Sequence, residues 1–152
     1  MSIGLQLKYL WHDVDVFELE VAASNGEFSG AAKTYISIGG LDEAAEDLKG
    51  FPRDLSDIRE LKFGEFGRKS AGGGAHVRFF CKDSAGHAVA EIRIESEDES
   101  NTGSRWNLPE QTAHFFGEIE ASAVDDFVAE LRQLEESKSG AASLRFANSL
   151  TR

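Results

Sequence analysis

Short runs in which apolar and polar residues alternate dominate the chain. In one of them Phe17, Leu19 and Val21 alternate with Glu18 and Glu20, which is the period-2 pattern of a strand that buries one face. Eight such runs predict strands: Leu5–Trp11, Val14–Val21, Thr34–Ile38, Ile58–Phe66, His76–Lys82, Ala88–Ile94, Thr112–Ala121 and Ala142–Asn148. Because most of these runs have one polar face, we expect an antiparallel sheet with one face in water.

Two segments change to helical spacing. Residues 41–49 and 123–136 carry apolar side chains at steps of three and four, which places them on one side of a helix. The apolar stripes are Leu41, Ala44, Ala45 and Leu48 in the first helix and Val124, Phe127, Val128, Leu131 and Leu134 in the second. Ser122 and Asp125 resemble a capping box at the start of the second helix, with Asp in place of the usual Glu or Gln.

These elements predict an α+β fold, with a single antiparallel sheet of about six to eight strands and two helices packed on one face. The length of 152 residues suits one domain spanning residues 1–152. No repeat and no change of composition marks a domain boundary. Val14 and Val16 have the opposite parity to Phe17, so a β-bulge or a twist of the strand is expected near Val16–Phe17.

The chain is strongly acidic. It has 16 Lys and Arg residues against 27 Asp and Glu residues, a formal net charge of −11. This charge repels phosphate backbones, so nucleic-acid binding is not expected, whereas a cationic partner is favoured. No run approaches 18 consecutive apolar residues, so no membrane-spanning helix is expected. The single cysteine, Cys81, cannot form an internal disulfide and fits a reducing, cytoplasmic location.

Basic residues gather in one segment, residues 58–82. It contains six bases and two acids: Arg59, Lys62, Arg68, Lys69, Arg78 and Lys82, with Glu60 and Glu65. One interpretation, which we favour, is that these bases pair with acidic residues on neighbouring strands. The other is that they form a patch that faces an anion.

The residues that could carry chemistry form no recognisable catalytic or metal-binding motif. The histidines, at positions 12, 76, 87 and 114, lack the HExxH spacing and a nearby cysteine pair. Cys81 shares the apolar parity of Val77 and Phe79, so a buried, unreactive thiol is expected. The glycine-rich residues 69–75 lack the G-K-[ST] ending of a phosphate-binding loop. We therefore expect no catalytic residue, no metal and no cofactor.

An acidic connection is the candidate partner-binding surface. Residues 95–109 are long, polar and acidic, and Trp106 lies among them without a local reason for burial. Large aromatic residues are enriched at the centres of protein interfaces. We predict that Glu97, Asp98, Glu99 and Trp106 contact a basic protein.

Two longer segments resemble a known family. They are SNGEFSG (24–30) followed by GGLDEAAEDLKGFP (39–52), and VRFFCKDSAGH (77–87) followed by AVAEIRIES (88–96), with a closing AVDDFVAELRQL helix. The pattern resembles small bacterial proteins related to the WapI-type immunity family, over about two thirds of the chain. Immunity proteins bind and neutralise a cognate secreted toxin domain, often a nuclease. The resemblance implies this role and assigns no contact residues.

The sequence thus favours a non-enzymatic protein-binding domain, in its specific form an immunity protein that neutralises a basic, nuclease-type toxin. Two alternatives stay open. A small-molecule-binding module or enzyme would need a cleft between sheet and helices, with a histidine or carboxylate near Arg78 or Lys62. A homo-oligomeric structural domain would use an exposed strand edge.

Overall fold

The computed structural model describes residues 3–67, 72–97 and 109–147. Those residues contain eight strands and two helices, as the alternating and helical patterns predicted. In chain order the elements are β1 (Gly4–His12), β2 (Val16–Ser24), β3 (Ser29–Ser37), α1 (Gly40–Leu48), β4 (Arg59–Phe63), β5 (Gly74–Cys81), β6 (Ala88–Glu95), β7 (Thr112–Ile119), α2 (Ala121–Ser137) and β8 (Ala141–Arg145).

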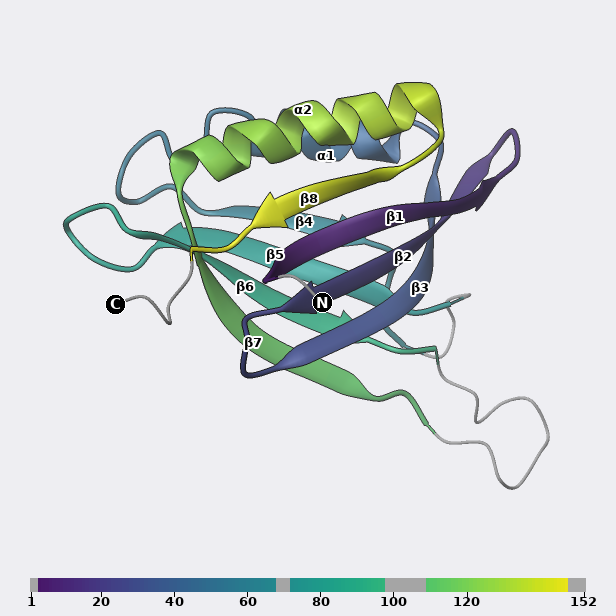
Figure 1. Cartoon of the computed structure of the whole chain (residues 1–152), viewed down its shortest axis with the longest axis horizontal. Helices are drawn as coiled ribbons and strands as arrows, with labels where there is room; N and C mark the ends of the chain where they lie inside the picture. The colour runs from purple at the N-terminus through teal and green to yellow at the C-terminus, as the bar shows by residue number, and fades with distance from the viewer. Residues whose placement is uncertain (1–2, 68–71, 98–108, 148–152) are drawn as a thin grey trace.

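The strands form two separate sheets. The first has the order β3-β2-β1-β8 and the second has the order β4-β5-β6-β7, and every pairing is antiparallel. The prediction of one sheet with both helices on one face was therefore wrong. Alternation shows which side of a strand is buried, but it does not show which strands pair. Figure 1 shows the first sheet in front of the second, with both helices above them.

A single core fills the space between the sheets and the helices. The largest fully buried side chains come from both sheets and both helices: Phe17, Phe63, Phe79, Phe127, Leu5, Leu7, Leu19, Leu41, Leu48, Ile92, Leu131 and Leu134. The polar residues that alternate with them on the strands therefore lie on the outer faces of the two sheets.

A β-bulge shapes the first sheet, but not at the predicted place. The register between β1 and β2 shifts between Tyr9 and Trp11, so the bulge lies in β1 rather than at Val16–Phe17. Val14 lies before the start of β2 and is 88% exposed. Its position in the alternating pattern therefore gave no information about which face of β2 is buried. The shift places Trp11 opposite Glu18 on the outer face.

The two sheets approach each other along β3. The Gly73 N–H donates a hydrogen bond to the carbonyl of Lys33 (2.7 Å). Farther along, a Cβ atom built on Gly30 would lie 2.7 Å from the Cβ of Ala113. Only a residue without a side chain allows the backbone to come this close. This side of the molecule is thus closed by direct contact between the sheets.

On the other side, the helices close the gap between the edge strands. Helix α2 packs against β8, α1 packs against β4, and the helices pack against each other (Figure 1). The Glu130 carboxylate of α2 accepts a hydrogen bond from the Ser143 N–H of β8 (3.0 Å). This contact satisfies a backbone donor at the edge of the first sheet.

A buried carboxylate joins the two helices. Glu135 of α2 is 7% exposed, and its oxygens accept hydrogen bonds from the N–H groups of Gly39, Leu41 and Asp42 (3.1, 3.1 and 3.3 Å). These groups lie at the N-terminus of α1, where backbone donors lack partners within the helix and a negative charge is favourable. Glu135 therefore caps α1 from a position far away in the sequence.

Candidate functional site

The predicted partner-binding residues fall mostly outside the described part of the chain. Asp98, Glu99 and Trp106 all lie beyond the described residues, so their predicted role stays a prediction. Glu97 is described and exposed. It follows β6, and its charge is close enough to Tyr35 of β3 to contribute to the raised pKa of that hydroxyl.

Two exposed aromatic side chains stand on the outer face of the first sheet. Trp11 pairs with Glu18, and Glu18 pairs with Tyr35, so the three residues form one row across β1, β2 and β3. We call this the aromatic row. Trp11 is 48% exposed and Tyr35 is 38% exposed. The Tyr35 hydroxyl donates a hydrogen bond to the Glu18 carboxylate (2.8 Å), and this bond is the main reason that the pKa of Tyr35 is raised.

Tyr35 also borders a groove of about 490 Å³ between β3, α1 and β4. Its acidic residues are Glu43 and Asp47 of α1, Glu60 of β4, and Glu65 just beyond β4. We call these four carboxylates, with Tyr35, the acidic groove. All four carboxylates are exposed, and none has a side-chain hydrogen bond or ion pair among the described residues. Glu43 and Asp47 are four residues apart on α1 and therefore lie on the same side of that helix.

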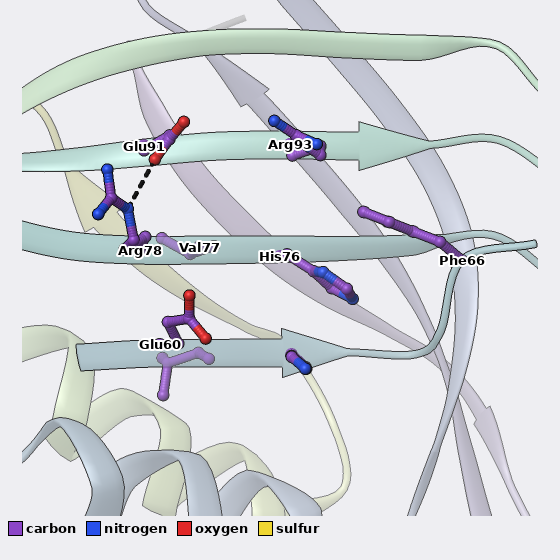
Figure 2. Close-up of a pocket in the computed structure, with 9 residues that line it drawn as sticks. Glu60, Phe66, His76, Val77, Arg78, Glu91 and Arg93 are labelled. Atoms are coloured by element: carbon purple, nitrogen blue, oxygen red, sulfur yellow. Dashed lines mark hydrogen bonds and ion pairs between the residues drawn. The ribbon is translucent and has the colours of Figure 1, made fainter. Parts of the chain in front are cut away.

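A second cavity, of about 300 Å³, lies on the outer face of the second sheet (Figure 2). One row of residues that contributes to it alternates in charge: Glu60 of β4 is opposite Arg78 of β5, and Arg78 is opposite Glu91 of β6. Glu91 is fully engaged. One of its oxygens lies 2.8 Å from Nε of Arg78, and the other lies 2.7 Å from Nε2 of His114. The Arg78 guanidinium is the main reason that the pKa of Glu91 is lowered.

The neighbouring row carries only basic residues. Lys62 of β4 is opposite His76 of β5, His76 is opposite Arg93 of β6, and Arg93 is opposite His114 of β7. We call these four residues the basic row. Lys62 and Arg93 are exposed and form no hydrogen bond or ion pair with a described residue. The sequence pattern placed each of these residues on a polar strand face, but only the register places them in one row.

His76 is the most unusual member of the basic row. Its Nε2 atom is buried and has no hydrogen-bond partner among the described residues. The Phe66 ring stacks on the imidazole, with the ring centres 3.8 Å apart, and Figure 2 shows Phe66 beside His76 at the end of β5. Burial lowers the pKa of His76, and the positive charges of Lys62 and Arg93 lower it further.

The basic segment 58–82 is only partly explained by pairing. Arg59, Arg78 and Lys82 form ion pairs with Asp57, Glu91 and Glu118 (2.8, 2.8 and 2.9 Å). The favoured interpretation, pairing with a neighbouring strand, is confirmed for Arg78 only, because Asp57 lies just before β4, the strand of Arg59, and Glu118 belongs to β7, which does not adjoin β5. Arg68 and Lys69 lie outside the described residues. Lys62 is the base in the segment for which the alternative, a patch facing an anion, still applies.

Other candidate groups are accounted for by local contacts. His87 lies 2.6 Å from Asp83 in the β5–β6 turn, and His12 contacts the Tyr9 hydroxyl (2.8 Å). Burial raises the pKa of the partly buried Cys81 thiol. The described residues contain no group of three or more His, Cys, Asp or Glu side chains that could hold a metal ion. Within the same residues, no helix is long and apolar enough to span a membrane.

Comparisons with known proteins give no family for this chain. No family model matches it. A search of curated proteins finds no relative, and a search of solved structures finds no similar fold. The surfaces described above are therefore the basis for a proposed function.

Proposed function

We propose that this chain is a non-enzymatic protein-binding domain that binds a basic protein through the acidic groove and the aromatic row. The observation that carries the proposal is the position of Tyr35, which belongs to both surfaces. It joins two exposed aromatic rings to four carboxylates that have no side-chain partner among the described residues.

Such a surface combines two properties of protein interfaces. Aromatic side chains such as Trp11 and Tyr35 contribute much of the binding energy when a partner covers them. Unpaired carboxylates such as Glu43 and Asp47 attract lysine and arginine side chains and speed the encounter with a positively charged protein. Glu97, which the sequence assigned to the interface, lies beside this surface through its proximity to Tyr35.

The specific form of the proposal is an immunity protein. A nuclease that holds phosphate backbones presents a basic cleft, and an acidic groove with aromatic neighbours suits such a cleft in charge. The family resemblance in the sequence implies the same role. The partner we expect is therefore a basic toxin domain of the nuclease type.

The test is affinity capture from the cells that make the protein, at low and at high salt. The site variant replaces Glu43 and Asp47 with lysine. Its matched control replaces Asp125 and Glu136 with lysine, because these two exposed carboxylates of α2 change the net charge by the same amount. A third protein, Trp11→Ala, tests the aromatic row without changing the charge.

We expect the wild type and the α2 control to capture the same basic protein, and expect high salt to release it. The α1 variant should lose it, and Trp11→Ala should bind at least about tenfold more weakly. Equal loss in both lysine variants would show that only the net charge matters and would contradict a localised site. Capture that is the same for all four proteins would reject the proposed surface.

A further inference from the structure

The two adjacent rows on the outer face of the second sheet differ in how their charges are arranged. In the row of Glu60, Arg78 and Glu91, neighbouring strands place opposite charges side by side, which stabilises a sheet. In the basic row the same three strands place Lys62, His76 and Arg93 side by side. Lys62 and Arg93 stand on either side of His76, and no carboxylate alternates with them. The basic row therefore lacks the opposite-charge pairs that stabilise the row beside it.

Among the described residues, no carboxylate forms an ion pair with Lys62 or Arg93. On β6, Arg93 is flanked by Glu91 and Glu95, and both are engaged elsewhere. Glu91 binds Arg78 and His114, and Glu95 accepts a hydrogen bond from the Gly67 N–H (2.8 Å). On β4 the nearest carboxylate to Lys62 along its strand face is Glu60, and no ion pair joins the two.

Lys62 and Arg93 border the same cavity. Their strands are separated by β5, so their backbones are about 10 Å apart at the usual strand spacing. Both side chains are long enough to converge on one anion between them, above His76. The Phe66 and His76 rings form one wall of the cavity, and Figure 2 shows Arg93, His76 and Phe66 grouped at that end.

We infer that this cavity binds a small ligand bearing a phosphate or carboxylate group, held between Lys62 and Arg93. An oxyanion there would accept a charge-assisted hydrogen bond from each of the two cations, and such bonds are among the strongest polar contacts in proteins. Burial lowers the pKa of His76 between them, which favours the neutral imidazole. The cavity meets one part of the small-molecule alternative, because His76 lies near both Lys62 and Arg78. It lies on the outer face of the second sheet, however, and not between sheet and helices.

This inference is independent of the proposed protein-binding function. Lys62 also borders the acidic groove, but Arg93 does not. Arg93→Gln therefore tests the anion site alone. Lys8→Gln is the matched control, because Lys8 is an exposed lysine on the outer face of the first sheet and the substitution removes the same charge.

The experiment measures the melting temperature and, by calorimetry, the affinity of each protein for inorganic phosphate and for succinate. Ionic strength is kept low and constant, so that general salt effects on stability do not contribute. Phosphate tests one compact anion between the two cations, and succinate tests two separated carboxylates. The anion that binds more tightly shows whether the cavity prefers one compact anion or two separated carboxylates.

We expect at least one of the two anions to bind the wild type and raise its melting temperature. Arg93→Gln should bind it at least about tenfold more weakly. Lys8→Gln should retain wild-type binding.

Two results would overturn the inference. The first is that neither anion binds the wild type. The second is that Arg93→Gln and Lys8→Gln lose binding equally, which would mean that only the net charge attracts the anion.

Discussion

Glu135 and His76 both bury polar side-chain atoms, but the two side chains have different surroundings. The Glu135 carboxylate receives three backbone N–H groups at the start of α1. The Nε2 atom of His76 is buried with no partner among the described residues, and Lys62 and Arg93 lie opposite His76 on the two flanking strands. Buried polar groups are normally satisfied. Glu135 therefore helps to hold the two helices together, whereas His76 keeps a buried nitrogen that no described residue satisfies.

The largest expected effect is at Glu135. Glu135→Ala should lower the free energy of unfolding by about 2–3 kcal/mol, because it removes the cap and leaves backbone donors of α1 without an acceptor in a buried place. Glu135→Gln keeps one acceptor oxygen, so its loss should be about 1 kcal/mol. Urea denaturation measures both. Glu136→Ala, one residue along α2 and exposed, is the control, and an equal loss there would contradict the capping role.

An exposed ion pair also joins the two helices, and we expect it to contribute less to stability than the buried Glu135 cap. Arg132 of α2 lies 2.9 Å from Glu46 of α1, and the hydrogen bond from Arg132 lowers the pKa of Glu46. Both side chains are largely in water, where screening and side-chain entropy offset the attraction. Arg132→Ala should therefore shift the urea midpoint much less than Glu135→Ala does. A comparable shift would mean that the helices are held together by surface charge rather than by the buried cap.

The sequence predicted the elements of the fold well, because periodicity is a local property. Leu41, Ala44, Ala45 and Leu48 are all buried in α1, as the spacing indicated. The division into two sheets was missed because no local pattern shows that the consecutive strands β3 and β4 belong to different sheets, or that β8 pairs with β1 from the other end of the chain. The predicted capping box was wrong for a related reason. Helix α2 begins at Ala121, ahead of Ser122, and its N-cap residue Glu120 makes no side-chain hydrogen bond.

The candidate surfaces were harder to predict than the elements. Alternation placed Lys62, His76 and Arg93 on polar strand faces, but their alignment depends on the register between three strands. The acidic groove joins α1 to β3 and β4, so it exists only in the folded chain. Among the residues predicted to contact a partner, Glu97 alone is described, and its place beside Tyr35 follows from how β3 lies against the second sheet.

The smallest expected effect is a change in the pH dependence of stability at His76. Burial and the charge of Lys62 lower the pKa of His76 in the folded protein, whereas an unfolded histidine titrates near about 6.5. The unfolded chain therefore binds this proton more readily. The stabilising contribution of the neutral imidazole is fully present above that pH and is lost as the pH falls through the lower, folded pKa.

His76→Gln keeps a polar side chain and removes this titration. The charges of Glu60 and Glu95 on the flanking strands only partly offset the lowering of the His76 pKa. The free energy of unfolding, measured by urea denaturation from pH 7 to pH 5 without added anion, should therefore fall less steeply for the variant than for the wild type. If the unfolding free energies of variant and wild type fall equally with pH, protonation of His76 costs the folded protein nothing. His76 would then differ from Glu135 in its hydrogen bonding, but its protonation would not affect stability.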